Sequence, residues 1–292
     1  MVGATDDPKK SAKVGKSRRR YMCSIYLINV GANDSHASVA RSPVFNNLSF
    51  VYVSILDPAG TQYPPEMHPF VRAPDNRRTH SDPDWDKLTY GDVCSNRKAA
   101  ALKNVTPGDI LLFWGMLWQN NGENNGNNWH GCGFTGERGW YLLGALRVAE
   151  IVKRKQDIDN LAPPDKCRAI KNAHCLNRRW NAGDRVFLGE KDKKYSRLFD
   201  KAVELWVPKT EQKSESKWKD SLLYKALRAA DGRYLSLNGT PRWYSSLRTC
   251  RKMWVWDLNN DKQRERTEIV KKAIQKVNED FDLLKDAHCD PK

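Results

Sequence analysis

Two nearly all-apolar stretches decide the fold: Ser24-Ile-Tyr-Leu-Ile-Asn-Val30 and Ile110-Leu-Leu-Phe-Trp-Gly-Met-Leu-Trp118. Both are rich in β-forming residues and lack the polar alternation of a half-exposed strand, which is typical of strands buried on both faces. The longer one is less than half of the ~20 residues that a membrane-spanning helix needs. We therefore expect both stretches in the core of a mixed β-sheet.

Weaker patterns extend this fold along the chain. Further strands are predicted at residues 48–56, 140–152 and 185–188, and helical patterns lie at 94–104, 196–205, 221–230 and 264–284. Residues 57–92 and 119–128 are predicted to be loops. The expected fold class is α+β, a mixed β-sheet core or PUA-like partial barrel with helices concentrated in the C-terminal half. We expect a disordered basic tail at residues 1–20 and a single globular domain at 21–292.

The charge balance indicates the partner. The chain has 50 lysines and arginines against 35 acids, for a formal net charge of +15. A surplus of this size attracts polyanions, so double-stranded DNA is the first candidate and an acidic membrane surface a distant second. No secretory or spanning segment is evident, and the expected location is the cytoplasm. No membrane partner and no obligate protein partner are expected.

Several common motifs are missing from the sequence. It contains no Walker loop, GxGxxG, HExxH, CxxC pair or GxSxG, and no zinc deaminase signature. Nucleotide hydrolysis by a P-loop, Rossmann redox chemistry and the common zinc hydrolases therefore have no support. No metal and no other cofactor is expected.

A polar turn follows the first strand, in the segment Asn29-Val-Gly-Ala-Asn-Asp-Ser-His36. Polar side chains at the end of a buried strand face an open end of the sheet, where ligands commonly bind. Asp34 could act as a general base or as an anion beside a developing cation, and His36 could move a proton or bind phosphate. Alternatively, these side chains only bond their own backbone in a turn.

A second candidate segment is His80-Ser-Asp-Pro-Asp-Trp-Asp86, followed by Asp92. Carboxylates crowded among aromatic residues have shifted pKa values and can do acid–base work. The alternatives are metal ligation, or solvated acids that balance Arg72, Arg77 and Arg78. An EF-hand is not indicated, because its distal glycine and glutamate are missing.

Aromatic residues and one histidine complete the candidates. Most of the tryptophans are expected in the core, but a subset beside basic residues would suit stacking on a flipped base. His174, in Asn172-Ala-His174, is a further candidate, although a lone histidine is more often structural.

Six short motifs together carry a resemblance to a known family. They are Asp34-Ser35, Ser42-Pro43-Val44-Phe45, Asp82-Pro83-Asp84, Gly108-Asp109 before Leu111–Trp114, Tyr141–Gly144, and Asn172 with His174. In this order, over residues 21–250, they resemble the third family of nucleotide-modification-associated domains, found in bacteria and phages near DNA-modification and defence genes. The chain is also similar to antiviral DNA glycosylases that excise glucosylated hydroxymethylcytosine from phage genomes.

This resemblance implies a DNA glycosylase that hydrolyses the N-glycosidic bond of a hypermodified cytosine in phage DNA and leaves abasic sites. Such a site needs a carboxylate near the sugar and a positioned water. The expected carboxylate is Asp84 or Asp34, and the residue that places water is His36 or Asn33. Expected substrate or DNA contacts are Trp85, Tyr90, Asp82, Asp92, Ser35, Arg41, Arg77, Arg78, Trp114, Trp118 and His174. The rival hypotheses are a non-catalytic reader of modified bases and a metal-dependent nuclease.

Overall fold

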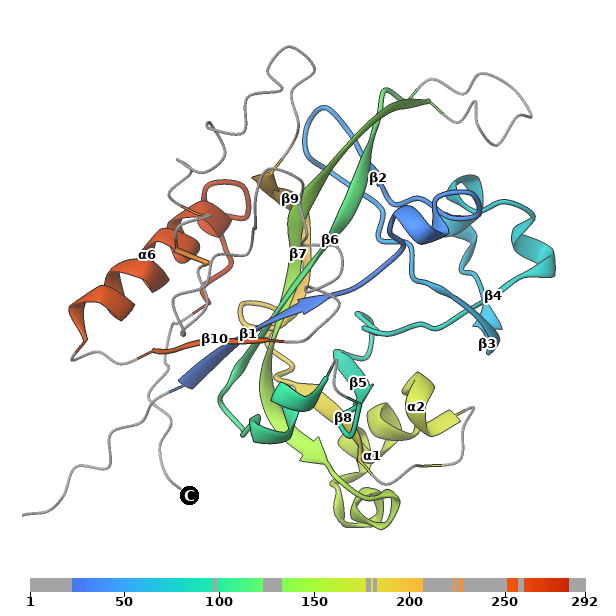
Figure 1. Cartoon of the computed structure of the whole chain (residues 1–292). Coiled ribbons are helices and arrows are strands. Elements are labelled where there is room, and N and C mark those ends of the chain that lie inside the picture. The colour runs from blue at the N-terminus through green and yellow to red at the C-terminus, as the bar shows by residue number, and fades with distance from the viewer. Residues whose placement is uncertain are drawn as a thin grey trace, which may run out of the picture.

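A computed structural model describes residues 23–96, 99–122, 133–176, 180, 183–206, 223, 226–227, 251–256 and 260–283 (Figure 1). Its strands are β1 (Cys23–Asn29), β2 (Pro43–Val44), β3 (Leu56–Gln62), β4 (Arg78–Thr79), β5 (Thr89–Val93), β6 (Ile110–Asn120), β7 (Phe134–Val152), β8 (Asp184–Gly189), β9 (Arg197–Trp206) and β10 (Arg251–Trp256). Its α-helices are α1 (Pro163–Ile170), α2 (Ala173–Leu176) and α6 (Asp261–Gln275). Its 3₁₀ helices are η1 (Asp34–His36), η2 (Pro65–Phe70), η3 (Pro74–Asn76), η4 (Ala100–Asn104) and η6 (Lys155–Asn160).

Eight strands form one mixed sheet in the order β10-β1-β6-β7-β8-β5, while β2 pairs with β6 and β9 with β7. The two decisive apolar stretches are the neighbours β1 and β6, which run parallel. The strands β3 and β4 form a separate small sheet. The α+β class with α-helices in the C-terminal half is confirmed. Among the described strands the path ends at β10 and β5, so the sheet does not close into a barrel.

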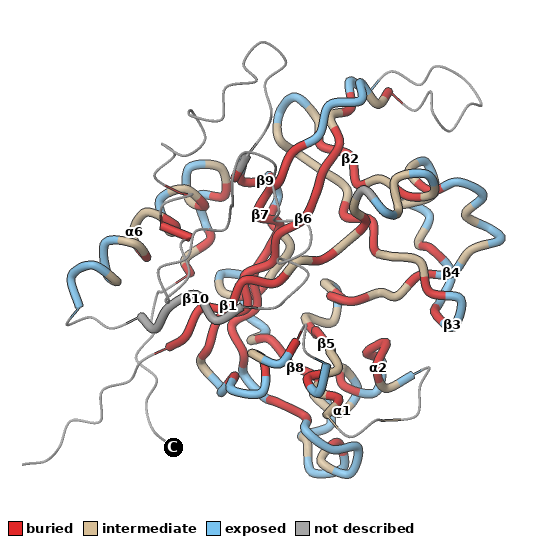
Figure 2. The backbone as a smooth tube through the Cα atoms, in the orientation of Figure 1, coloured by how far each residue is buried: buried red, intermediate tan, exposed pale blue. Residues whose placement is uncertain are grey.

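The first strand is buried on both faces, as its sequence predicted. Ile25 and Leu27 belong to one core cluster, which also holds Val270 and Ile274 of α6. Tyr26 belongs to a second cluster, together with residues of β5, β6 and β7. Figure 2 shows the continuous burial of the central strands, and Figure 1 shows α6 on the side of the sheet away from β3 and β4. The sheet is therefore a rigid support at the centre of the described structure.

A glycine–aspartate turn ties the start of β1 to the start of β6. Asp109 Oδ1 accepts a hydrogen bond from Ser24 N at 2.6 Å, and Asp109 Oδ2 accepts one from Thr106 N at 2.8 Å. Gly108 has a φ of +89°, a conformation that favours glycine. This turn fixes the parallel register that carries the end of β1 to the site described below.

The prediction of a strand at residues 48–56 is wrong. Leu48 has a φ of +67°, and the strand β3 begins only at Leu56 and continues through Asp57 and Pro58. Residues 52–54 of the apolar segment before it are buried, but the backbone of this segment bonds to several separate partners, such as Ser42 Oγ for Val53 N. Burial without a continuous partner strand produced the misleading pattern. Residues 57–92 hold short elements from β3 to β5 instead of one long loop.

The prediction of a helix at residues 196–205 is also wrong, because this segment forms the strand β9, which pairs with β7. The register between them shifts twice, and Leu142 opposes Val203 while Gly144 opposes Leu198. These irregularities interrupt the two-residue period of a strand, so the buried residues Phe199, Ala202 and Val203 have a spacing that resembles a helix.

The remaining predictions vary in outcome. Strands at 110–118, 140–152 and 185–188 are confirmed, and the last helix is confirmed as α6, which begins three residues earlier than predicted and ends at Gln275. Of residues 94–104, only η4 is helical among those described. The basic tail and most of 119–128 and 221–230 lie outside the described residues. Within the part of the chain that is described, each helix is too short or too polar to cross a bilayer.

Candidate functional site

A cleft of about 650 Å³ opens at the carboxyl end of β1. Its walls come from the segments 29–36 and 55–58, from His80 and Asp82, from residues 90–93 and from His174, so the segments that the sequence analysis considered separately meet here. Two of the central segments are fixed by the main sheet, since Val30 N donates to Trp114 O of β6 at 2.9 Å and β5 pairs with β8. The cleft is therefore built on rigid elements, which suits a binding or catalytic site.

The turn after β1 forms one wall of the cleft. Gly31 has a φ of +77°, and a Cβ there would lie 3.0 Å from the ring of Tyr52, so the turn requires glycine. Ser35 Oγ donates to Asn33 Oδ1 at 2.7 Å, and Asn33 N donates to His36 Nδ1 at 3.3 Å. The turn thus bonds to itself while Asn33, Ser35 and His36 line the cleft.

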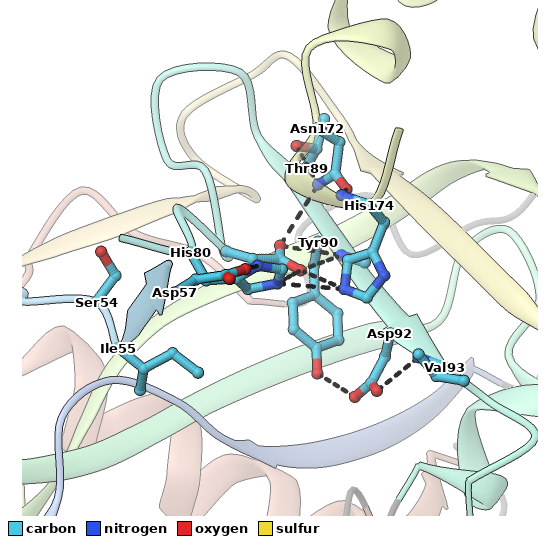
Figure 3. Close-up of polar contacts among 12 residues, drawn as sticks. Ser54, Ile55, Asp57, His80, Thr89, Tyr90, Asp92, Val93, Asn172 and His174 are labelled. Carbon is cyan, nitrogen blue, oxygen red and sulfur yellow. Dashed lines mark hydrogen bonds and ion pairs between the residues drawn. The ribbon is translucent and has the colours of Figure 1, made fainter. Parts of the chain in front are cut away.

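His80 follows β4 and is held by a carboxylate from β3. Its Nδ1 lies 3.1 Å from Asp57 Oδ2, and its other ring nitrogen, Nε2, lies 3.3 Å from Nε2 of His174. Figure 3 shows the two imidazole rings edge to face, with Asp57 behind His80. Pairing of β3 with β4 therefore sets one histidine of the cleft in a fixed orientation.

Asp82 is the most enclosed carboxylate of the cleft, with only 2% of its side chain exposed. Both of its oxygens accept from Gly91 N, at 2.9 and 2.8 Å, and Oδ1 also lies 3.4 Å from Asn172 Nδ2. Its Oδ2 lies 3.4 Å from His174 Nε2 and 3.7 Å from His80 Nε2. Two histidines and the amides of β5 and Asn172 thus surround one buried carboxylate.

Asn172 connects this carboxylate to the second histidine. It is fully buried, its Nδ2 donates to Thr89 Oγ1 at 3.0 Å, and its Oδ1 accepts from His174 N at 3.0 Å. Gly91 of β5 lies directly against this pair: a Cβ there would lie 2.5 Å from His174 Cδ2 and 2.7 Å from Asn172 Oδ1. The short helix α2 can bring its histidine this close only because β5 has a glycine at position 91.

The cluster shifts the pKa of its members. Burial lowers the pKa of His80, but the neighbouring carboxylates of Asp82 and Asp57 outweigh burial and place it above the ordinary value. Burial acts to raise the pKa of Asp82, yet the contacts with His174 and His80 hold it below the ordinary value. The two histidines around Asp82 therefore favour its ionised form.

The pKa of Asp92 is displaced in the opposite direction from that of Asp82. Burial raises its pKa, and the hydrogen bond from Tyr90 OH, 2.6 Å from Asp92 Oδ2, offsets this only in part. Val93 N donates to Oδ1 at 2.7 Å, and Figure 3 shows the hydroxyl of Tyr90 directed at Asp92. Two carboxylates of one cleft thus have pKa values displaced in opposite directions, an arrangement that acid–base sites use.

The structure brings together seven of the residues predicted for the site: Asn33, Ser35, His36, Asp82, Tyr90, Asp92 and His174. Asp34 begins η1, and its side chain lies outside the described residues. The three predictions that came from separate stretches of sequence, the turn after β1, the aspartate-rich segment and His174, therefore converge on one cleft.

Asp84 and three tryptophans lie elsewhere among the described residues. Asp84 is buried and accepts from Lys87 N at 3.0 Å as well as from Lys87 Nζ. Trp85 packs edge to face on Phe113 with ring centroids 5.2 Å apart. Trp114 and Trp118 are 1% and 2% exposed in the core. Outside the cleft and packed in this way, these rings are not available to stack on a base.

The three predicted arginines bond to backbone carbonyls. Arg41 Nε donates to Ala37 O at 2.9 Å, Arg77 Nε to Arg72 O at 2.7 Å and Arg78 Nη1 to Gly60 O at 3.3 Å. None of the three is among the described residues that line the cleft. Their contact with DNA phosphates stays a prediction.

Sequence reasoning missed Asp57 as a cleft residue, and it quoted Asn29 and His80 within candidate segments without a role. His80 lies two positions before Asp82, and Asp57 follows a predicted strand, but both signals are common in ordinary turns. Asn172 entered only through the family motif. What joins these residues is the pairing of β3 with β4 and the contact of α2 with β5, which no local pattern reveals.

Comparison with known proteins gives one match. The family described as nucleotide modification associated domain 3 matches residues 24–268. No curated protein and no solved structure matches the chain. The matched range begins in β1, ends within α6 and includes every segment that lines the cleft. Because it covers more than half of the sequence, the chain belongs to the nucleotide modification associated domain 3 family.

Proposed function

We propose that this protein excises a modified base, such as glucosylated hydroxymethylcytosine, from phage DNA by hydrolysing its N-glycosidic bond. One observation carries the proposal: a chain with a net charge of +15 gathers three carboxylates, Asp57, Asp82 and Asp92, in one half-buried cleft. The positive surplus attracts the DNA backbone. The carboxylates suit the oxocarbenium charge that develops on the sugar as the bond breaks.

The size of the cleft fits one nucleotide. A volume of about 650 Å³ lies within the range of ~300–1,000 Å³ that small-ligand sites have. A duplex does not enter such a space, so the target nucleotide must be extruded from the stack, as in other enzymes that act on bases. The amides of Asn29 and Asn33 and the hydroxyl of Ser35 offer donors and acceptors to the base edge and to hydroxyls of a modification.

Asp92 is the best candidate for the proton donor to the departing base. Its carboxyl lines the cleft, and burial raises its pKa, which favours a protonated acid. Tyr90 OH and Val93 N hold both oxygens in place. Asp57 and Asp82 line the cleft in contact with His80 and His174 and supply negative charge there. In this proposal Asp57 and Asp82 take the role that the sequence assigned to Asp84, which lies outside the cleft.

The test uses matched duplexes with plain, hydroxymethylated or glucosylated cytosine. After incubation with the full-length protein, one half of each sample is treated with hot alkali, and strand breaks are resolved on a denaturing gel. Excision predicts breaks only in a modified duplex and only after alkali. Asp92→Asn should lower base release by about 10²–10⁴-fold, the usual contribution of a general acid. Asp84→Asn, the same change outside the cleft, should keep base release.

Two outcomes would overturn the proposal. Breaks without alkali would identify a nuclease. No breaks in any duplex, while gel shifts still distinguish the duplexes, would identify a reader of modified bases.

Loss of base release in both aspartate variants, together with a lower melting temperature, would show that Asp92 acts through folding and not through the reaction.

A further inference from the structure

We propose that His80, Asp82 and His174 bind one divalent transition-metal ion. The atoms His80 Nε2, His174 Nε2 and Asp82 Oδ2 converge on one point, with separations of 3.3, 3.4 and 3.7 Å. All three residues line the cleft. This inference goes beyond the proposed function and does not depend on it, and it departs from the expectation that the chain uses no metal.

The three separations match a coordination sphere. Nitrogen and oxygen ligands lie about 2.0–2.1 Å from a tetrahedral zinc ion, which places neighbouring ligand atoms about 3.3–3.4 Å apart. Two of the three measured separations equal these values, and the third is 3.7 Å. Small adjustments of the half-buried His80 ring would therefore complete the geometry.

Surrounding groups hold each of the three ligand residues in place. Because the partner of His80 Nδ1 is a carboxylate, Asp57, that nitrogen keeps its hydrogen, and a metal ion that displaces the proton from Nε2 would bind the lone pair of that nitrogen in the cleft. A carboxylate–histidine–metal arrangement of this kind is the usual support of a metal-bound imidazole. Gly91 N holds both oxygens of Asp82, and Asn172 anchors the backbone of His174.

The ligand set selects the class of ion. Two imidazoles and one carboxylate suit zinc, iron(II) and related transition metals, whereas magnesium and calcium prefer oxygen ligands. Three protein ligands leave a further position, which is typical of catalytic and not of structural zinc sites. Since the ligands line the cleft, that position is open to water or to a substrate oxygen.

The test measures metal binding directly. Full-length protein is stripped with a chelator, dialysed and titrated with Zn²⁺ and with Mg²⁺ in a calorimeter. We expect one Zn²⁺ per chain and no comparable binding of Mg²⁺. Asp57→Asn removes only an orienting partner and should weaken zinc binding by about 10–100-fold. Asp82→Asn and His174→Gln remove ligand atoms and should weaken it further.

His68→Gln is the matched control, because His68 Nε2 bonds to Tyr63 O at 2.8 Å away from the cleft. It should leave zinc binding unchanged. Zinc should also raise the melting temperature of the wild-type protein, which reports on the site even where a ligand variant fails to fold. Equal zinc affinity in the wild type, Asp57→Asn and Asp82→Asn, or no stoichiometric binding by the wild type, would overturn the inference.

The two proposals fail separately. A protein that binds zinc at these residues but releases no base would overturn only the proposed function. A protein that releases base at full rate but binds no metal would overturn only the metal site.

Discussion

The substitution Gly91→Ala adds only one methyl group, but it should displace the residues that line the cleft. The new Cβ would lie 2.5 Å from His174 Cδ2 and 2.7 Å from Asn172 Oδ1. Carbon atoms in contact are about 3.5–4.0 Å apart, so the imidazole must retreat by about 1 Å. Asn172 and His174 are 0% and 6% exposed, which leaves little room for this retreat. Overpacking of this kind costs about 1–3 kcal/mol of unfolding free energy.

The functional loss should be larger than the loss of stability. A misplacement of about 1 Å within a site can cost roughly 10²-fold in rate, and His174 and Gly91 both line the cleft, so base release per folded molecule should fall by about that factor. Urea unfolding measures the stability, and the alkali assay measures the rate. Zinc titration gives a third measurement, because His174 is a proposed ligand.

Gly144→Ala is a matched control in the core. Its Cβ would lie 2.5 Å from Trp85 Cη2 and 2.6 Å from the carbonyl oxygen of Arg197, a clash at least as severe as that at position 91. It should therefore destabilise the fold comparably while the folded fraction keeps its rate and its zinc affinity. If both variants lose rate and affinity equally per folded molecule, the placement of His174 in the site is refuted.

Three further predictions concern the stability of the fold. Because burial raises the pKa of Asp92 above its unfolded value near 3.8, stability should fall as the pH rises through the window between the two values. Asp92→Asn removes this dependence on pH, so the free energy of unfolding of the variant should rise relative to that of the wild type as the pH increases. A difference between the two that stays constant with pH would contradict the raised pKa of Asp92. Asn260→Ala removes the cap that accepts from Gln263 N and should cost about 1 kcal/mol, seen as an earlier urea midpoint. Phe113→Ala empties a fully buried position and should cost about 3–5 kcal/mol, whereas a loss below 1 kcal/mol would show that the core refills the space.

The centre of the fold was predictable because its signal is local. The strands β1, β6 and β7 are apolar enough to be recognised without their neighbours, and α6 has a regular apolar face. The segments before β3 and in β9 were misread because their burial depends on partners: separate bonds for Val53, and a shifted register opposite Leu142 and Gly144. In both segments the tertiary contacts override the local pattern.

The candidate site was predictable in its parts but not as a whole. Polar residues after β1 and the aspartate-rich segment stood out because they interrupt apolar or basic sequence. Their convergence with Asp57 and His174 depends on the contacts of β3 with β4 and of α2 with β5. The same cause explains why Asp84 was favoured over Asp92. Both are acids within two positions of an aromatic residue, and only the fold directs one into the cleft and the other toward Lys87.

The position of β1 between β6 and β10 has a consequence for truncated forms of the protein. Residues 23–27 pair with 251–256, so the strand that leads to the cleft has no free edge in the described structure. A fragment that ends at residue 250 would expose that edge beside apolar side chains, a template onto which another chain can add as a strand. Such a fragment should aggregate. A fragment that ends at residue 268, the end of the family match, would keep β10 but would lack Val270 and Ile274, which belong to the core. We therefore expect the C-terminal segment to protect the protein against self-association.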